Sequence, residues 1–301
     1  MQSLLLQLAE IVDRAVPSGE HYIRQGPLWA LRYEGPTEPS LAVYEPMFCV
    51  VAQGTKAILV GNERLTYGAG RFLLNTVAMP ASGRVVEASA ARPCLWAMIE
   101  LDPSLVAEVV RESDVPAPSE GPLRAMDAEA IDADLLAAVV RLVRLLETPE
   151  DAAFLRPLLL REIVYRLSRG GQAARLRQIA ATGGEADRVL GTVERLRVHF
   201  RETVSVDELA RDCGLSPSAL HRHFKRVTAM TPVQFQRQMR LQEAKRLMVG
   251  EGLDAAGAGA RVGYEDPSYF SREYRRFFGA PPRRHVERLR SGTGMEDLAY
   301  R

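Results

Sequence analysis

Two stretches decide the fold, DELARDCGLSPSALHRHFKRVTAMTP at residues 207–232 and RVGYEDPSYFSREYRRFFGAPPRR at residues 261–284. They match each other at an offset of about 50 residues, so that Gly214 corresponds to Gly263. In each copy a short helical segment precedes the glycine, and a Ser-Pro or Asp-Pro pair typical of a helix start follows it. Because glycine permits the positive φ of a tight turn, the repeat predicts two helix-turn-helix motifs.

The second helix of each motif has an apolar and a polar face. The positions expected to pack inward are Leu220, Phe224 and Val227 in the first copy and Phe270, Tyr274 and Phe277 in the second. The outward positions are Ser218, His221, Arg222 and Lys225, and then Ser268, Tyr269, Arg272, Arg275 and Arg276. A cationic, hydroxyl-bearing face suits the major groove of DNA, because arginine can donate two hydrogen bonds to guanine and helix N-termini hold phosphate.

One long amphipathic helix is predicted between the motifs, over about residues 232–249, with Arg237, Arg240, Lys245 and Arg246 exposed. Its length is roughly 27 Å at ~1.5 Å per residue. Successive major grooves on one face of a duplex are about 34–36 Å apart. A spacer of this order can therefore present both motifs to DNA from a single chain.

The first half of the chain follows a different pattern. Residues 41–101 predict seven short strands, because runs of Val, Ile, Leu and aromatic residues alternate with Gly, Pro and Asn breaks. Strands of this number and spacing are typical of a small β-barrel or sandwich. Two apolar stripes near residues 135–146 and 155–167 predict an antiparallel helix pair that covers the barrel or meets a partner chain.

The chain is thus expected to be α+β, a β-barrel with a helical hairpin followed by an all-α domain. Gly183 and Gly184 lie at the best candidate joint, which predicts domains at residues 1–182 and 183–290 and a tail at residues 291–301. The formal net charge is +1, but residues 185–290 hold 20 Lys and Arg against 14 Asp and Glu, while the remainder holds 19 against 24. The basic C-terminal part is expected to meet a polyanion.

The composition excludes several classes of protein. At 47% hydrophobic and 26% charged residues, the sequence is that of a globular protein, and no apolar run approaches the ~18 residues of a membrane span. The first 15 residues lack the features of a signal peptide. Cys49, Cys94 and Cys213 are odd in number and form no CxxC pair, so we expect reduced thiols and a cytoplasmic location.

On these motifs the sequence resembles the AraC/XylS family of transcription regulators. Residues 261–284 are similar to the family signature and residues 207–232 to its first helix-turn-helix. The segments YEPMFCVVAQGTKAILVG, residues 44–61, and RFLLNTVAMPASGRVVEAS, residues 71–89, resemble a cupin-like sensor domain found in one branch of that family. The resemblance covers about residues 20–290 and implies an effector-binding and dimerisation domain joined to a DNA-binding domain.

The resemblance also implies roles for residues. It makes 216–227 and 267–278 the reading helices, with base-facing positions at Ser218, His221, Arg222, Ser268, Tyr269 and Arg272. Lys225, Arg275 and Arg276 are better candidates for phosphate contacts. The implied partners are double-stranded DNA, a small-molecule effector and a second copy of the chain, and a contact with RNA polymerase is compatible with the family.

Residues that would hold the effector are harder to assign. Tyr44, Phe48, Phe72, Trp96 and Met98 could line a pocket or form the barrel core. The N-terminal domain could also be a ligandless interaction module on a constitutive DNA-binding protein. We expect no enzyme, metal or cofactor, since none of the five histidines lies in residues 41–101 and no nucleophile-elbow, phosphate-binding or dinucleotide motif is present.

Two further expectations concern single residues. Cys49 could be a reactive sensor thiol, although a buried inert thiol is more common. Gly257 and Gly259 lie in the first helix of the second motif, where the family usually has a larger apolar residue. Because a glycine inside a helix costs about 1 kcal/mol relative to alanine, this motif is expected to be less stable or to order fully only on DNA.

Overall fold

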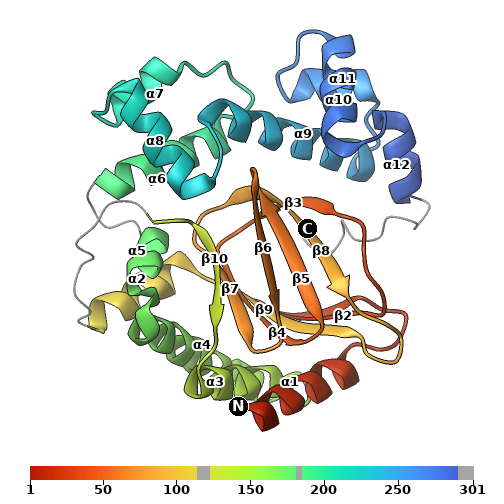
Figure 1. Ribbon diagram of the computed structural model, residues 1–301, viewed down its shortest axis with the longest axis vertical. Coiled ribbons are helices and arrows are strands. Elements are labelled where there is room, and N and C mark those ends of the chain that lie inside the picture. The colour runs from red at the N-terminus through yellow and green to blue at the C-terminus, as the bar shows by residue number, and fades with distance from the viewer. Residues whose placement is uncertain (114–122, 181–184, 291–301) are drawn as a thin grey trace.

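A computed structural model describes residues 1–113, 123–180 and 185–290 (Figure 1). The N-terminal domain contains two antiparallel sheets that face each other. One has the strand order β1-β2-β9-β4-β7-β10 and the other the order β3-β8-β5-β6. The strands are β1 (Tyr22–Gln25), β2 (Leu28–Tyr33), β3 (Ser40–Tyr44), β4 (Met47–Gln53), β5 (Thr55–Val60), β6 (Glu63–Gly68), β7 (Arg71–Asn75), β8 (Met79–Glu87), β9 (Cys94–Glu100) and β10 (Met126–Ala130).

The seven strands predicted in residues 41–101 are confirmed as β3 to β9. The chain also forms the β1–β2 hairpin and β10, which the sequence pattern did not predict. β10 has the sequence MDAEA, without β-branched or aromatic residues, and it is held by antiparallel pairing with β7. Pairing to an existing sheet edge therefore outweighs its weak strand propensity.

Helices cover the outer face of the six-stranded sheet and form a first hydrophobic core with it (Figure 1). They are α1 (Gln2–Ala15), α2 (Pro103–Glu112), α3 (Ala133–Arg144), α4 (Ala152–Leu167), a π-helical turn η1 (Ser168–Gln172) and α5 (Ala173–Ala180). The predicted helix pair is α3 and α4. Strand β4 is buried on both faces, because Phe48 and Val50 point toward these helices while Cys49 and Val51 point into the barrel.

The C-terminal domain is entirely helical in its described residues. Its helices are α6 (Glu185–Val198), α7 (Val206–Asp212), α8 (Pro217–Thr228), α9 (Pro232–Gly250), α10 (Ala255–Arg261), α11 (Pro267–Phe278) and α12 (Pro282–Arg290). The predicted caps are confirmed. The Ser216 hydroxyl accepts a hydrogen bond from Ala219 N, Asp266 accepts one from Ser268 N, and Thr231 and Gln234 form a capping box.

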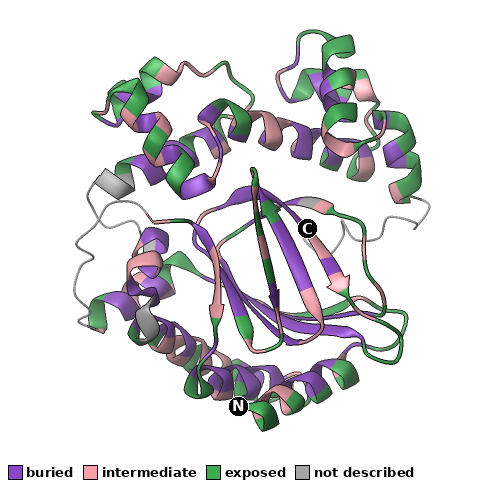
Figure 2. Ribbon diagram, in the orientation of Figure 1, coloured by how far each residue is buried: buried purple, intermediate pink, exposed green. Residues whose placement is uncertain are grey.

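The two domains share a hydrophobic core. The interior of the barrel continues through Ala125 and Met126 into the first helix-turn-helix, where Phe224 and Val227 belong to the same cluster. Ala125 N donates a 3.0 Å hydrogen bond to the Val227 carbonyl at the end of α8. Helix α9 lies against β3 and β8, and Figure 2 shows buried residues along it and along the strands below. The C-terminal helical domain therefore packs directly against one end of the barrel.

The structure corrects the prediction that the polar face of α9 is fully exposed. Lys245 is buried beside the Phe278 ring, and Arg237 and Arg240 are half-buried, whereas Arg246 is exposed. The cause is tertiary packing, because α9 is covered by the barrel on one side and by both helix-turn-helix motifs on others. No helix in the described ranges is long and apolar enough to cross a membrane.

The glycines of α10 also have a packing role that the sequence did not reveal. The helix is formed over Ala255–Arg261, and Gly259 is buried. A Cβ at Gly259 would lie 2.9 Å from the Phe270 ring of α11. The expectation that these glycines only weaken the motif is therefore wrong for Gly259, because its missing side chain lets α10 and α11 approach closely.

Candidate nucleic-acid interface

Helix α8 presents the polar face that its sequence predicts. Leu220, Phe224 and Val227 are buried in the core of the first motif. Among the predicted contact residues, Ser218, Arg222 and Lys225 are exposed and His221 is half-buried. Gly214 has φ +63°, which gives the turn before α8.

Helix α11 repeats the arrangement. Phe270 and Tyr274 are fully buried, while Phe277, predicted to face inward, is half-buried. The predicted contact residues Ser268, Tyr269, Arg272, Arg275 and Arg276 are all exposed. Gly263 has φ +90° in the turn before the helix. The two reading helices lie at opposite ends of α9 (Figure 1).

The cations on these two faces have few carboxylate partners. Within the described residues, Arg222, Lys225, Arg272 and Arg275 form no ion pair with a carboxylate, and Arg276 makes one long contact of 3.9 Å with Glu273. By contrast, Arg161 in the N-terminal domain bridges Glu108 and Glu112, both at 2.7 Å. The cations on the outer faces of α8 and α11 are therefore not neutralised by close carboxylates of the described residues.

Two residues that fix the relative placement of the motifs were missed by the sequence analysis. Arg240 of α9 donates to four backbone carbonyls, those of Phe200 (2.6 Å), Arg201 (3.1 Å), Glu202 (2.8 Å) and Gly263 (2.9 Å). The first three carbonyls lie between α6 and α7, and the fourth belongs to the turn before α11. Burial without a carboxylate partner lowers the pKa of the Arg240 guanidinium. Arg240 thus connects one motif to the other.

The second missed residue is Glu273, which lies on α11 but is buried. Its carboxylate accepts a 3.0 Å hydrogen bond from Arg237 of α9. Spacing on α11 indicated the apolar contacts of this helix, but it could not indicate a partner on α9. A charged residue on the inner face of an otherwise amphipathic helix is the one signal that could have suggested such a pair.

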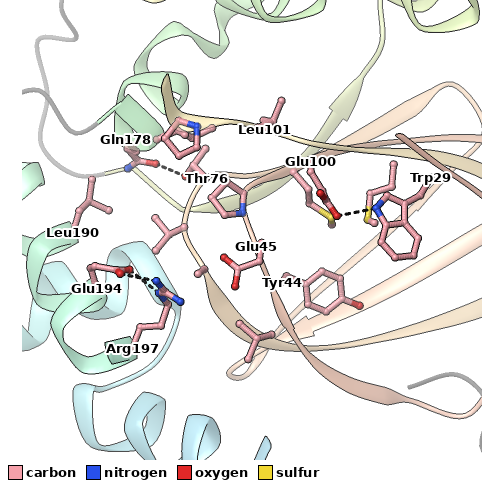
Figure 3. Close-up of a pocket in the computed structure, with 18 of the residues that line it drawn as sticks. Trp29, Tyr44, Glu45, Thr76, Glu100, Leu101, Gln178, Leu190, Glu194 and Arg197 are labelled. Carbon is pink, nitrogen blue, oxygen red and sulfur yellow. Dashed lines mark hydrogen bonds and ion pairs between the residues drawn. The ribbon is translucent and has the colours of Figure 1, made fainter. Parts of the chain in front are cut away.

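A cavity of about 770 Å³ lies where the two domains meet (Figure 3). Residues of the barrel rim, α5 and α6 line it. They include Trp29, Val43, Tyr44, Glu45, Met47, Thr76, Met98, Glu100, Leu101, Gln178, Ile179, Leu190, Gly191, Glu194 and Arg197. The volume is typical of pockets that hold small molecules, about 300–1,000 Å³. Because α6 belongs to the reading domain, a molecule in this cavity would touch both domains.

The predicted effector residues do not all meet at this cavity. Tyr44 and Met98 line it. Trp96 lies deeper in the barrel, with Lys56 Nζ 3.7 Å from its ring centroid. Phe48 and Phe72 must be reassigned, since they stack at 5.2 Å in the core between sheet and helices, on the opposite face of the six-stranded sheet. Alternation along β4 and β7 separates these rings from the barrel interior.

The cysteines are buried thiols. Cys49 and Cys94 both lie inside the barrel and are fully buried. Burial raises the pKa of the Cys94 thiol to about 12. Complete burial limits access of reagents to Cys49, while Lys56 Nζ lies 3.9 Å from its sulfur, so the reactive and inert alternatives for Cys49 both stay predictions. Among the described residues, no group of three or more His, Cys, Asp and Glu side chains is placed to hold a metal ion.

Comparisons with known families agree with this architecture. A model described as the AraC-type transcriptional regulator N-terminus matches residues 26–175, and a helix-turn-helix domain model matches residues 209–288. The domain boundary at residues 182 and 183 falls between the two matches but remains a prediction, because residues 181–184 lie outside the described part of the chain.

Curated relatives match part of the chain. The HTH-type transcriptional regulator ArgR of Pseudomonas aeruginosa is 26% identical over 134 residues, which are 44% of this chain and 41% of that protein. The HTH-type transcriptional activator RhaS of Escherichia coli is 33% identical over 88 residues, 29% of this chain and 32% of that protein. The chain therefore aligns with less than half of the length of these relatives.

A solved structure shares the whole fold. An apo ToxT variant from Vibrio cholerae superposes with a TM-score of 0.55 at 9% identity, over 87% of this chain and 98% of that one. At this identity the similarity concerns the fold alone. The matched families are transcription regulators rather than enzymes. With both family models matched in one chain, over residues 26–175 and 209–288, and two exposed, cationic helices on the predicted motifs, the protein belongs to the AraC family of transcriptional regulators.

Proposed function

We propose that one chain reads duplex DNA by placing α8 and α11 in the major groove. The base-facing residues would be Ser218, His221, Arg222, Ser268, Tyr269 and Arg272, and the phosphate-facing ones Lys225, Arg275 and Arg276. The observation that carries this proposal is that Arg222 and Arg272, at matching positions of the two motifs, are exposed and form no ion pair with a carboxylate of the described residues. A cation that no carboxylate neutralises keeps its full attraction for a polyanion.

Alanine substitutions test this assignment on DNA selected from a random pool. Arg222→Ala and Arg272→Ala should each weaken binding to the selected site by about 1–3 kcal/mol and leave non-specific binding nearly unchanged. Arg276→Ala should weaken binding to all sequences and reduce the salt slope by about one. Arg246→Ala is the control, since Arg246 is paired with Glu243 and Glu251. An unchanged selected site in both of the first two variants would contradict the assigned faces.

We further propose that a small molecule in the cavity sets the DNA-binding activity. A ToxT structure with a similar fold is described as bound to an unsaturated fatty acid, with a TM-score of 0.54 at 8% identity. In the present chain the cavity is lined by Tyr44 and Met98 of the barrel and by Leu190 and Gly191 of α6. An effector that prefers one arrangement of the two domains would shift their equilibrium by its difference in affinity.

Filling the cavity tests this second proposal. No atom lies within 4 Å of a Cβ built at Gly191, so Gly191→Phe should enter the cavity without distorting α6. In reporter cells this variant should hold transcription at one level whatever the growth medium, while Gly191→Ala should respond like the parent. If Gly191→Phe responds normally, the alternative of a constitutive DNA-binding protein with a ligandless N-terminal module is favoured.

Helix α4 supports a third proposal, that the protein is a homodimer. Phe154, Leu158 and Tyr165 lie on one side of this helix and are 77%, 54% and 47% exposed. The opposite side packs in the first core through Ile163 and Val164. A helix that is apolar on both sides usually covers its outer side with another protein surface. The stripe is short and self-complementary, so a second copy is the partner we expect.

Light scattering during size-exclusion chromatography tests the dimer. The double variant Phe154→Ser with Leu158→Ser should run as a monomer, whereas Leu6→Ser should not change the mass. Leu6 is a fair control because it is 58% exposed on α1. A monomeric parent protein, or a double variant that remains dimeric, would rule out this interface.

A further inference from the structure

The cavity between the domains has an unbalanced charge. Three carboxylates reach it, those of Glu45, Glu100 and Glu194, but only two guanidinium groups, those of Arg24 and Arg197. The remaining lining of the cavity is mostly apolar, with Val43, Met47, Met98, Leu101, Ile179 and Leu190 among its residues. The carboxylates of the described lining therefore exceed its guanidinium groups by one, and the rest of the cavity wall is largely apolar.

Both arginines already form ion pairs with carboxylates of the cavity. Arg197 donates two hydrogen bonds of 2.7 Å to the Glu194 carboxylate, from Nε and Nη2. Arg24 Nη2 lies 3.0 and 3.1 Å from the Glu100 oxygens, and Trp29 Nε1 donates to the same carboxylate at 2.8 Å. Each of these pairs is close to neutral as a unit.

Glu45 is the carboxylate that remains. Its carboxylate forms no hydrogen bond or ion pair with another described residue, and the residue is exposed. Figure 3 shows it between the Glu194–Arg197 pair and Tyr44. Burial of the group by surrounding protein raises the pKa of Glu45; Arg197 opposes this shift, whereas Glu194 and Glu100 add to it. The negative charges of Glu194 and Glu100 near Glu45 favour a positive charge at this point of the cavity.

We propose that the effector is a cationic amphiphile, an amine or guanidine on an apolar body, whose charge pairs with Glu45. This inference rests on the proposed effector role of the cavity and specifies its ligand. An anionic effector would meet the unpaired carboxylate of Glu45, and both arginines of the described lining are already paired with other carboxylates. The apolar body would lie against Val43, Met98 and Leu190, which join the barrel rim to α6.

Three probes that differ only in their polar group separate the alternatives. Isothermal titration of the full chain with phenylbutylamine, phenylbutanol and phenylbutyrate near neutral pH should give the tightest binding for the amine, by about tenfold over the alcohol. Glu45→Gln should remove that preference, and Glu45→Lys should transfer it to phenylbutyrate. Glu10→Gln should behave as the parent, since Glu10 is an exposed residue of α1 outside the cavity.

The outcomes distinguish this inference from the function on which it rests. If the alcohol or phenylbutyrate binds the parent as tightly as the amine, or if Glu45→Gln keeps the preference, the cationic class is wrong while the cavity remains an effector site. If none of the three probes binds, the cavity is not a small-molecule site and both statements fail. Neither result bears on the proposed DNA contacts, which are tested by separate binding measurements.

Discussion

Replacing Arg240 with methionine tests whether α9 is a rigid spacer. Methionine keeps most of the apolar stem of arginine but removes the guanidinium group that donates to the carbonyls of Phe200, Arg201, Glu202 and Gly263. Three of those carbonyls lie in the loop that leads into the first helix-turn-helix motif, and the fourth lies in the turn of the second motif. The substitution therefore removes the polar connection between the motifs and leaves the apolar core of each one intact.

The size of the effect follows from the four hydrogen bonds. A hydrogen bond from a charged donor contributes about 1.5–3 kcal/mol when its partner is left without a replacement. Arg240 is only half-buried, so water can replace part of what is lost, and the removal of a partly desolvated charge is itself favourable. Taking the low end of the range and halving it, we expect local stability to fall by about 3 kcal/mol in total.

Hydrogen exchange measured by mass spectrometry on the full chain reports this loss. Amides of α10 and α11 should exchange about a hundredfold faster in Arg240→Met, since about 1.4 kcal/mol corresponds to a factor of ten. Arg246→Met on the same helix is the matched control. Its guanidinium pairs with Glu243 and Glu251 on the surface, where such pairs contribute about 0–1 kcal/mol. Equal exchange in the two variants would refute the bracing role of Arg240.

Three further predictions concern packing and thiol chemistry. Gly259→Ala should destabilise the second motif by about 1–3 kcal/mol, because its Cβ would meet the Phe270 ring at 2.9 Å; a melting temperature equal to the parent's would contradict this contact. Gly191→Ala should instead raise stability by about 1 kcal/mol in a thermal melt, since it adds a helix-favouring residue in open space, and a decrease would show that the site is not open. Cys49 and Cys94 should resist alkylation in the native protein, because both are buried and the pKa of Cys94 is raised to about 12; rapid labelling of either thiol would show that the barrel opens readily.

Local sequence chemistry predicts the reading helices well. Caps at Ser216 and Asp266 and turn glycines at Gly214 and Gly263 act over a few residues, so their consequences can be inferred without a fold. Helical spacing likewise separates Phe224 from its exposed neighbours. The two motifs could therefore be placed to within a residue or two of their observed bounds.

Contacts between distant segments could not be predicted in this way. The role of Arg240 depends on carbonyls some 40 positions before it in the chain, and that of Glu273 on a partner 36 positions away. Gly259 carries no side chain whose pattern could show its contact with α11. These features follow from how helices pack, which periodicity along one helix does not encode.

The residues predicted to bind the effector show a different limit of prediction from sequence. Strand alternation shows that Phe48 and Cys49 face opposite sides of a sheet, but it does not show which side is the barrel interior. The cavity, moreover, is lined by strand ends and loops of the barrel together with α5 and α6, so its wall combines elements that are far apart in the sequence. Glu45 lies at such a rim, in the turn between β3 and β4.

The hydrophobic core that runs from the barrel through Ala125 to Val227 has a consequence for protein engineering. Chimeras that exchange sensor domains at residues 181–184 would cut a covalent link but would also split this core and leave apolar surface on both halves. Grafts that carry residues 123–126 together with the end of α8 that faces them should keep the shared hydrophobic core intact. Under the proposed effector role, a new ligand specificity is therefore better sought by altering the cavity lining than by exchanging whole N-terminal domains.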